Sequence, residues 1–229
     1  MLYKGKTLGE LKVMLGIDND SKNIASRCVI QMFGTNCKKL NQITDFTKVG
    51  IVAKTVTITP SGKNTEDTKL KHIDFEEWAD RDTDFENSDI YTYFCEHSFL
   101  CPIFCEHNPQ DKSQTTFEGF KRFAFDEYFI EHEVRRTWED SRKLIHNNEL
   151  EWEYAYDKKG HKCKNKSGSY KGAPNFPKSS EYNVFFRGGA NCSNEKMRTE
   201  CVNGIRMIPQ FFWLKGSYIT EKLKEISYI

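Results

Sequence analysis

A chain of 229 residues with 38% hydrophobic and 29% charged residues is typical of a globular protein long enough for a sizeable core. Its 34 basic and 33 acidic residues nearly cancel, so only the distribution of charge along the chain is informative about partners. No apolar run approaches the ~20 residues that span a bilayer, and four charged residues within the first twelve exclude a signal peptide. We therefore predict a cytoplasmic protein without membrane contact.

The eight cysteines are scattered and form no Cys-x-x-Cys pair, so we expect reduced thiols. One cluster, Cys95-Glu-His97 followed by Cys101 and Cys105, offers ligands of the kind that zinc prefers. However, Cys101 falls within an apolar stretch that predicts a buried strand, where cysteine packs as a small hydrophobe. We therefore predict no metal site in this chain.

Two short helices are predicted near the N-terminus. Thr7 and Glu10 have the spacing of a capping box, and leucines then recur at helical intervals up to Gly16. A second helix is predicted over residues 21–33, with Gly34 in the position of a C-terminal cap.

The most informative stretch begins at Asp45, runs through Gly-Ile-Val-Ala to Lys54, and continues as an apolar strand to Thr59. Strand alternation places Val52, Lys54 and Val56 on one face, so a lysine stands where a core residue is expected. A buried ammonium is costly unless a carboxylate or a phosphate neutralises it. Two interpretations follow: an ion pair between Asp45 and Lys54, or a Lys54 that faces a phosphate.

The middle of the chain alternates predicted loops with predicted elements. Residues 60–72 suggest a surface hairpin or loop, a short helix starts near Asp74, and residues 80–86 form an acidic, solvated loop. Strands are predicted over residues 90–94, 99–104 and 117–125.

The longest predicted helix covers residues 126–145 and carries Arg135, Arg136, Arg142 and Lys143. The simplest interpretation of these cations is a solvated helix face that pairs with its own acidic residues, and we favour it for Arg142 and Lys143. Arg136 is kept as a candidate phosphate contact.

Positive charge is concentrated between Lys158 and Lys178, where seven lysines and one histidine occur without an acidic residue. A positive segment on a slightly negative body is what binding to a phosphate backbone requires, and Lys162, Lys164 and Lys166 are the candidate contacts. The alternative is a solvated loop, which the Gly, Ser, Asn and Pro residues of the segment also favour.

Two later stretches complete the candidate binding residues. An apolar strand over residues 182–189 ends in Arg187 and two glycines, where an arginine can contact a guanine edge and glycines allow close approach of a ligand. The alternative is a turn with a surface arginine. Residues 207–215 predict a strand that ends at Lys215, with Ser217 as the N-cap of a helix that begins with Tyr218.

The spacing Asp45-x6-Val52-x-Lys54 resembles the D-x6-E-x-K signature of the mismatch-repair endonuclease MutH and its GATC-cutting restriction-enzyme relatives, with Val52 in place of the glutamate. Three further stretches follow in the family's order: Phe75-Glu-Glu-Trp78, Val134 to Asp140, and Phe212 to Thr220. Together they are most similar to the C-terminal, MutH-like half of Sau-type GATC-specific type II restriction endonucleases.

The resemblance implies an α/β, restriction-endonuclease-like fold, a mixed sheet flanked by helices, with two lobes around a DNA cleft. We expect a single MutH-like domain over residues 1–229, with approximate lobes 1–130 and 131–229. It implies DNA contacts for Lys54, Lys215, Ser217 and Tyr218. The family's helix acid falls at Ile30 or Gln31, so a second metal-site carboxylate is missing too.

The resemblance therefore implies a non-cutting effector domain that binds duplex DNA, by analogy GATC, with Asp45 and Lys54 as remnants of a catalytic site. Its partners would be double-stranded DNA and the catalytic nuclease domain of the same enzyme, which holds Mg²⁺, while this domain needs no cofactor. Metal-assisted hydrolysis needs carboxylate oxygens, which valine and isoleucine lack. The alternatives are an active Mg²⁺-dependent endonuclease with relocated carboxylates such as Glu66, Asp67 or Asp74, or a scaffold that only pairs with the catalytic domain.

Overall fold

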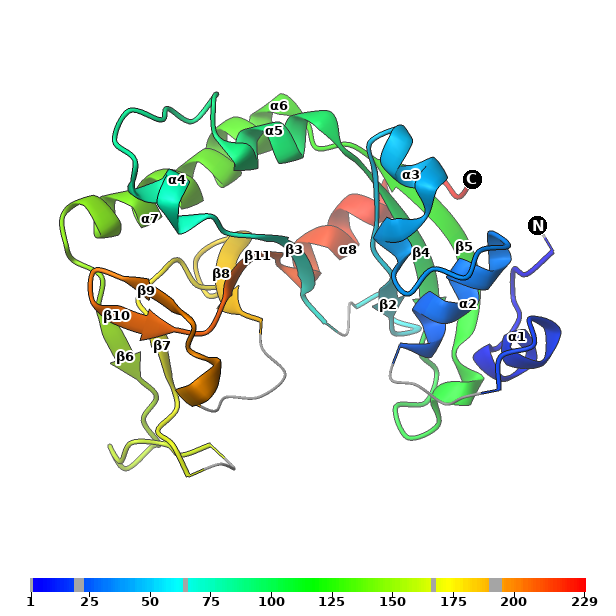
Figure 1. The fold of residues 1–229 in the computed structure, drawn as a ribbon. Coiled ribbons are helices and arrows are strands. Elements are labelled where there is room, and N and C mark those ends of the chain that lie inside the picture. The colour runs from blue at the N-terminus through cyan, green and yellow to red at the C-terminus, as the bar shows by residue number, and fades with distance from the viewer. Residues whose placement is uncertain (1, 19–22, 64–65, 166–167, 190–194) are drawn as a thin grey trace. The chain divides into compact units, whose positions relative to one another are not determined.

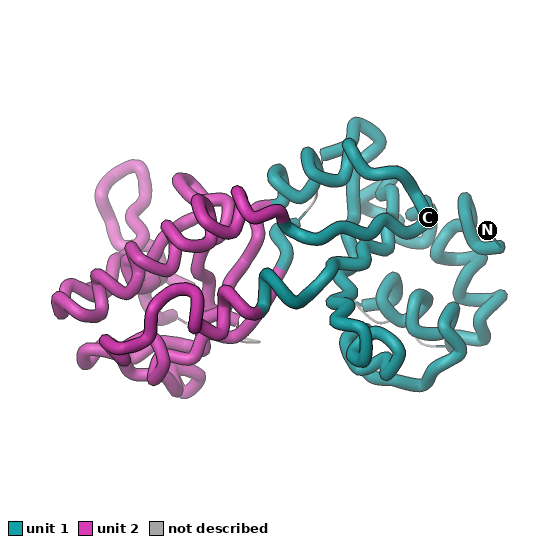
Figure 2. Tube along the Cα trace, turned by 90° about the horizontal axis from the view of Figure 1, so that it is seen from above, with its two compact units in different colours: residues 1–68, 93–125, 216–229 teal, residues 69–92, 126–215 magenta. Residues whose placement is uncertain are grey.

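The computed structural model describes residues 2–18, 23–63, 66–165, 168–189 and 195–229 as a mixed α/β protein with several sheets. The chain forms two compact units, coloured separately in Figure 2. Unit 1 comprises Met1–Thr68, Tyr93–Phe125 and Gly216–Ile229, and unit 2 comprises Lys69–Thr92 and Asp126–Lys215. The lobes expected from sequence were continuous, whereas each unit combines segments from separate parts of the chain.

Unit 1 is built from short helices and a mixed sheet, labelled in Figure 1. Its elements are α1 (Leu8–Met14), α2 (Ile24–Met32), η1 (Leu40–Gln42), α3 (Thr44–Lys48), β1 (Ile51–Ala53), β2 (Val56–Ile58), β4 (Ser98–Cys105), η2 (Lys112–Gln114), β5 (Thr116–Phe123) and α8 (Gly216–Lys224). The helix α5 (Asp89–Glu96) begins in unit 2 and ends in unit 1.

The predicted strand through Lys54 is present with an interruption. β1 and β2 both run parallel to β4, and they keep the same register, with Ile51 opposite Ser98 and Val56 opposite Ile103. Between them the Lys54 amide donates to the carbonyl oxygen of Leu100 at 2.9 Å, which continues the ladder across the gap. β5 pairs with β4 in the antiparallel sense, so the sheet is mixed, as predicted.

β4 is covered on both faces, which explains why all its residues from Phe99 to Cys105 are buried. On one face, Ala53, Leu100 and Phe104 join a core with side chains of α1, α2 and α3. On the other face, Lys121 of β5 donates through Nζ to the carbonyl oxygen of Leu223 in α8 at 2.7 Å. Helices thus flank the sheet on both sides.

The N-terminal helices follow their predicted caps. Thr7 Oγ1 accepts from the Glu10 amide at 3.2 Å, and the Glu10 carboxylate accepts from the Thr7 amide at 2.8 Å, so the capping box is confirmed. α2 is followed by Gly34 with φ of +65°, a backbone conformation that favours glycine and ends the helix as predicted.

Unit 2 contains the long helix and three small sheets. Its elements are β3 (Thr68–His72), whose first residue belongs to unit 1, α4 (Phe75–Ala79), α6 (Glu127–Phe129), η3 (Ile130–Val134), α7 (Arg135–His146), β6 (Trp152–Tyr154), β7 (Gly172–Pro174), β8 (Val184–Gly188), η4 (Glu195–Met197), β9 (Glu200–Val202), β10 (Ile205–Met207) and β11 (Gln210–Leu214). The segments α6, η3 and α7 form one continuous helical run, with a π-helical turn at η3, as the predicted long helix requires.

The largest sheet of unit 2 has the order β3-β11-β8, with β11 antiparallel to β8. Its inner face packs on a buried indole, since the ring centroids of Phe186 and Phe212 both lie 5.3 Å from Trp78 of α4. Trp138 of α7 packs on the same indole at 6.4 Å. This aromatic core holds the sheet against α4 and α7.

Two element predictions were wrong. Residues 90–94 form part of α5 and not a strand, because Ser88 Oγ accepts from the Tyr91 amide at 3.2 Å and Ile90 and Phe94, one helical turn apart, are both buried. Residues 68–72, expected in a surface hairpin or loop, form β3 of a three-stranded sheet, in which Thr68 and Leu70 are buried and Lys69 and Lys71 are half-exposed.

Among the described residues, none of the helices has the length and apolar character needed to cross a bilayer.

Candidate nucleic-acid interface

Lys54 lies on the side of the unit 1 sheet that α8 covers. By strand alternation it shares this face with Val52 and Val56, and Ile58 on the same face lines a small cavity of about 70 Å³ with Leu223 of α8. Val52 is buried and Lys54 is half-buried, as the alternation predicts. Asp45 is exposed in the first turn of α3.

The residue types near Asp45 and Lys54 in sequence offer few metal ligands. Val52 is 6% exposed and Ile30 is 3% exposed, so both are packed with hydrocarbon, whereas Gln31, the other candidate for the second acidic position, is half-buried. Within the described ranges, no group of three or more His, Cys, Asp or Glu side chains is arranged to hold a metal ion. The side chains of the Cys95–Cys105 cluster form no such group among the described residues. Cys101 is buried in β4, and burial raises the pKa of its thiol to about 12.

Asp67, a candidate relocated carboxylate, instead caps a helix. Its Oδ1 accepts from the backbone amide of Gly216 at 2.9 Å, at the first residue of α8. The helix therefore begins before Ser217, and the prediction of Ser217 as its N-cap was wrong because an acid distant in sequence supplies the cap. Ser217 is exposed and Tyr218 is half-buried within the first turn of α8.

Lys215 is the residue that follows β11, as the sequence predicted. Its backbone amide donates to the carbonyl oxygen of Asn183 at 2.8 Å, which extends the pairing of β11 with β8 by one residue. The side chain is half-buried. Lys215 thus stands at the end of the strand that runs beside Arg187.

Arg187 lies on the outer face of the β3-β11-β8 sheet, opposite Trp78. Its guanidinium carbon is 5.0 Å from the ring centroid of Phe185 and 5.0 Å from that of Trp213 on the neighbouring strand. The indole Nε1 of Trp213 also donates to the Arg187 carbonyl oxygen at 3.0 Å. Arg187 is an exposed residue, and its guanidinium lies near both rings.

A second cation on this face was not predicted from the sequence. Lys69 of β3 places its Nζ 3.1 Å from the ring centroid of Phe211, which is paired directly with Arg187. The alternation of Lys69 and Lys71 with buried Thr68 and Leu70 would have revealed it, had residues 68–72 been recognised as a strand. We call the set Lys69, Phe185, Arg187, Phe211 and Trp213 the cation–aromatic face.

The two glycines after Arg187 serve packing within the protein. A side chain at Gly188 would overlap Ile208, and one at Gly189 would overlap the Lys69 ammonium and the Phe211 ring. Packing within the protein therefore accounts for both glycines, because the protein's own side chains occupy the space beside them.

The described part of the lysine-rich segment forms two short hairpins, which we call the twin hairpin (residues 155–165 and 168–171). Isolated bridges join Tyr156 to Lys162 and Lys164 to Tyr170, and the strand pair β6–β7 forms its base. Lys162 and Lys164 are exposed, whereas Lys166 lies outside the described residues. Figure 1 shows this segment extending beyond β6 and β7.

Part of the segment's positive charge is neutralised within the protein. Lys178 forms an ion pair with Glu153 of β6. Neither Lys162 nor Lys164 has an ion pair with any described residue.

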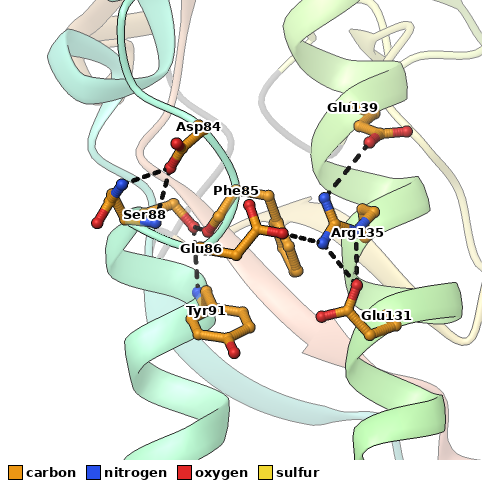
Figure 3. A network of polar contacts seen from close by, with 9 residues as sticks. Asp84, Phe85, Glu86, Ser88, Tyr91, Glu131, Arg135 and Glu139 are labelled. Atoms are coloured by element: carbon orange, nitrogen blue, oxygen red, sulfur yellow. Dashed lines mark hydrogen bonds and ion pairs between the residues drawn. The ribbon is translucent and has the colours of Figure 1, made fainter.

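The arginines of α7 differ in how far they are engaged internally. Arg135 pairs with Glu131 at 2.6 Å and with Glu86, and it lies 4.4 Å from the Phe85 ring (Figure 3). Its hydrogen bond lowers the pKa of the Glu86 carboxyl below the usual range. The charge of Arg135 is therefore balanced by acids, as its helix position suggested.

Arg136 and Arg142 have quite different surroundings. Arg136 is 55% exposed, with its Nε 3.8 Å from Asp140 and its guanidinium 4.3 Å from the Tyr182 ring. Arg142 is buried, donating to the carbonyl oxygen of Asp80 at 2.6 Å, so the expectation of a solvated side chain was wrong. Burial lowers the Arg142 pKa from its ordinary value.

Comparison of the sequence with models of protein families gave no match, and neither did comparison with curated proteins.

Proposed function

We propose that this chain is a duplex-DNA-binding domain of restriction-endonuclease-like, MutH-like fold that does not cut DNA by itself. By analogy with the family that its motifs resemble, the proposed recognition sequence is GATC. Its proposed partners are double-stranded DNA and the catalytic nuclease domain of the same enzyme, and that domain is the one that holds Mg²⁺.

The observation that carries the proposal is the cation–aromatic face of unit 2. Arg187 and Lys69 are each held over aromatic rings of β8 and β11. A guanidinium that is fixed by rings yet accessible loses little side-chain entropy when it binds, and its planar fork fits the O6 and N7 acceptors of guanine. Exposed lysines on the twin hairpin of the same unit supply charge for the phosphate backbone.

The residue types at the remnant site support binding without cleavage. Mg²⁺ is bound by hard oxygen ligands, and hydrolysis of a phosphodiester needs them at fixed positions. Val52 and Ile30 are buried apolar side chains, while Asp45 is exposed on α3. Asp67, which could have served as a substitute, is engaged at the start of α8.

The proposed effector role requires that DNA binding to this domain be thermodynamically linked to the activity of the catalytic domain. DNA bound to this domain activates a catalytic domain only if the active state of the enzyme binds that DNA more tightly than the inactive state. The proposal therefore predicts that a short GATC duplex, too small to be cut, accelerates cleavage of a second DNA by the enzyme that contains both domains.

The direct test measures equilibrium binding of this chain to a GATC duplex and to a GTAC duplex of equal composition, at two salt concentrations with Mg²⁺. The products are then separated on a denaturing gel. We expect tighter binding of the GATC duplex, weaker binding at high salt, and intact strands. Strand cleavage would refute the non-cutting role, and absence of binding at both salt concentrations would leave only a scaffold.

A further inference from the structure

The twin hairpin has a hydrogen-bonded centre where three parts of the chain meet. The Ala155 amide donates to the Lys171 carbonyl oxygen, the Cys163 amide to that of Ala155, and the Lys171 amide to that of Cys163, at 2.8–3.0 Å. Each hairpin leaves from this three-way junction. The backbone segments that carry Tyr154, Lys162, Lys164 and Tyr170 are therefore joined next to one another.

Two tyrosines beside the junction form a corner around one ammonium group. The rings of Tyr154 and Tyr170 have centroids 6.1 Å apart and planes at 83°. Lys162 Nζ lies 3.8 Å from the Tyr154 centroid and 5.7 Å from the Tyr170 centroid. Lys164 Nζ lies 5.4 Å from the Tyr170 centroid. Two cations thus gather around a single ring.

No described carboxylate offsets this pair of charges. Asp157, the acid closest in sequence to the first hairpin, accepts from the amides of Lys159 and His161 at 2.8 and 2.9 Å, and these bonds lower its pKa. Glu153 pairs with Lys178. Two ammonium groups near the same ring, neither in an ion pair with a described acid, favour an anion as a further partner.

We propose that Lys162 and Lys164, positioned by Tyr154 and Tyr170, bind one phosphodiester group of the nucleic-acid backbone. This inference rests on the proposed function and extends it by assigning roles within the twin hairpin. The lysines are the binding residues. The tyrosines are positioning residues, which restrict the ammonium groups before the phosphate arrives and so reduce the entropy lost on binding.

The test compares duplex binding by Tyr154→Leu, Lys162→Ala and the double variant, over a range of salt concentrations. Tyr156→Leu is the matched control, because Tyr156 is 57% exposed on the same hairpin and has no cation over its ring within the described chain. Lys162→Ala should lower the slope of log affinity against log salt by about 0.9. Tyr154→Leu should weaken binding about threefold with an unchanged slope, because the charge is retained.

In the Lys162→Ala background, Tyr154→Leu should have almost no effect, since the ring then has no ammonium to position. Equal effects of Tyr154→Leu in both backgrounds, or an effect no larger than that of Tyr156→Leu, would overturn the inference while leaving DNA binding itself intact. A chain that binds no duplex in its native form would overturn both the inference and the proposed function.

Discussion

At the scale of single residues, Arg187 carries the most specific prediction. Its guanidinium lies near the rings of Phe185 and Trp213, and its replacement by alanine should weaken binding of the GATC duplex by about 1–3 kcal/mol, or roughly five- to 150-fold. Arg187→Lys should keep the salt dependence but lose the preference for GATC over GTAC, because lysine retains the charge without the planar fork.

The control for Arg187 is Arg206→Ala, which removes an exposed arginine from another strand of unit 2, β10. Fluorescence anisotropy with labelled duplexes measures both variants. An equal loss of affinity for the two duplexes in Arg187→Ala would assign this residue to nonspecific phosphate binding.

Gly189 tests whether the cation–aromatic face depends on close packing. A methyl group there would overlap the Lys69 ammonium and the Phe211 ring, so Gly189→Ala should destabilise the protein by about 1–3 kcal/mol and also weaken DNA binding. In Gly9→Ala, on α1, the new methyl makes only ordinary contacts with Ser113 and Thr7. We expect this variant to raise the free energy of unfolding by about 0.5–1 kcal/mol. Urea unfolding gives both values, and a neutral Gly189→Ala would contradict the packing described above.

Residue patterns predicted which face of a strand a side chain occupies, but they did not predict contacts between distant parts of the chain. Alternation correctly predicted a lysine on the buried face at position 54, because the register of β1 and β2 is constant. Pairing across strands is invisible in one sequence, so the contact of Lys69 with Phe211 was missed. The same limit applies to Arg142, whose partners are carbonyl oxygens more than sixty residues away.

At the scale of elements, Arg142 joins α7 to the end of α4. Its guanidinium donates to the carbonyl oxygens of Asp80 and Glu77 at 2.6 and 3.4 Å, both at the C-terminal end of α4. Arg142→Met keeps the apolar stem over Trp138 and removes these bonds, so the free energy of unfolding should fall by about 2–3 kcal/mol.

The neighbouring exposed lysine provides the control for this prediction. Lys143→Met should change stability by no more than about 0.5 kcal/mol in the same urea titration. Equal values for the two variants would show that the buried guanidinium contributes nothing beyond its packing.

Elements whose signals are local were predicted well. Three such signals depend only on residues close together in the sequence: the capping box before α1, the glycine after α2 and the helical period over 126–145. α5 was predicted as a strand because Ile90, Tyr91 and Tyr93 favour strands by propensity, whereas burial of Ile90 and Phe94 on one helical face decided the outcome. Tertiary packing overrode local preference there.

At the scale of the whole molecule, the two units could not be divided from sequence. Residues 69–92 and 216–229 belong to units other than those their chain positions suggest. Two of the boundaries fall inside elements, since β3 and α5 each continue across one of them. Of the candidate binding residues predicted from sequence, Lys162, Lys164, Arg187 and Lys215 belong to unit 2, whereas Lys54 belongs to unit 1.

The central claim is that duplex DNA binds to unit 2 through the cation–aromatic face and the twin hairpin. Hydrogen–deuterium exchange of the chain with and without a saturating GATC duplex tests it most directly. We predict slower exchange over residues 155–165, 184–188 and 210–215 when DNA is bound, with no change in α1 (Leu8–Met14). Protection confined to α1 and α2, with none in those three segments, would contradict the account.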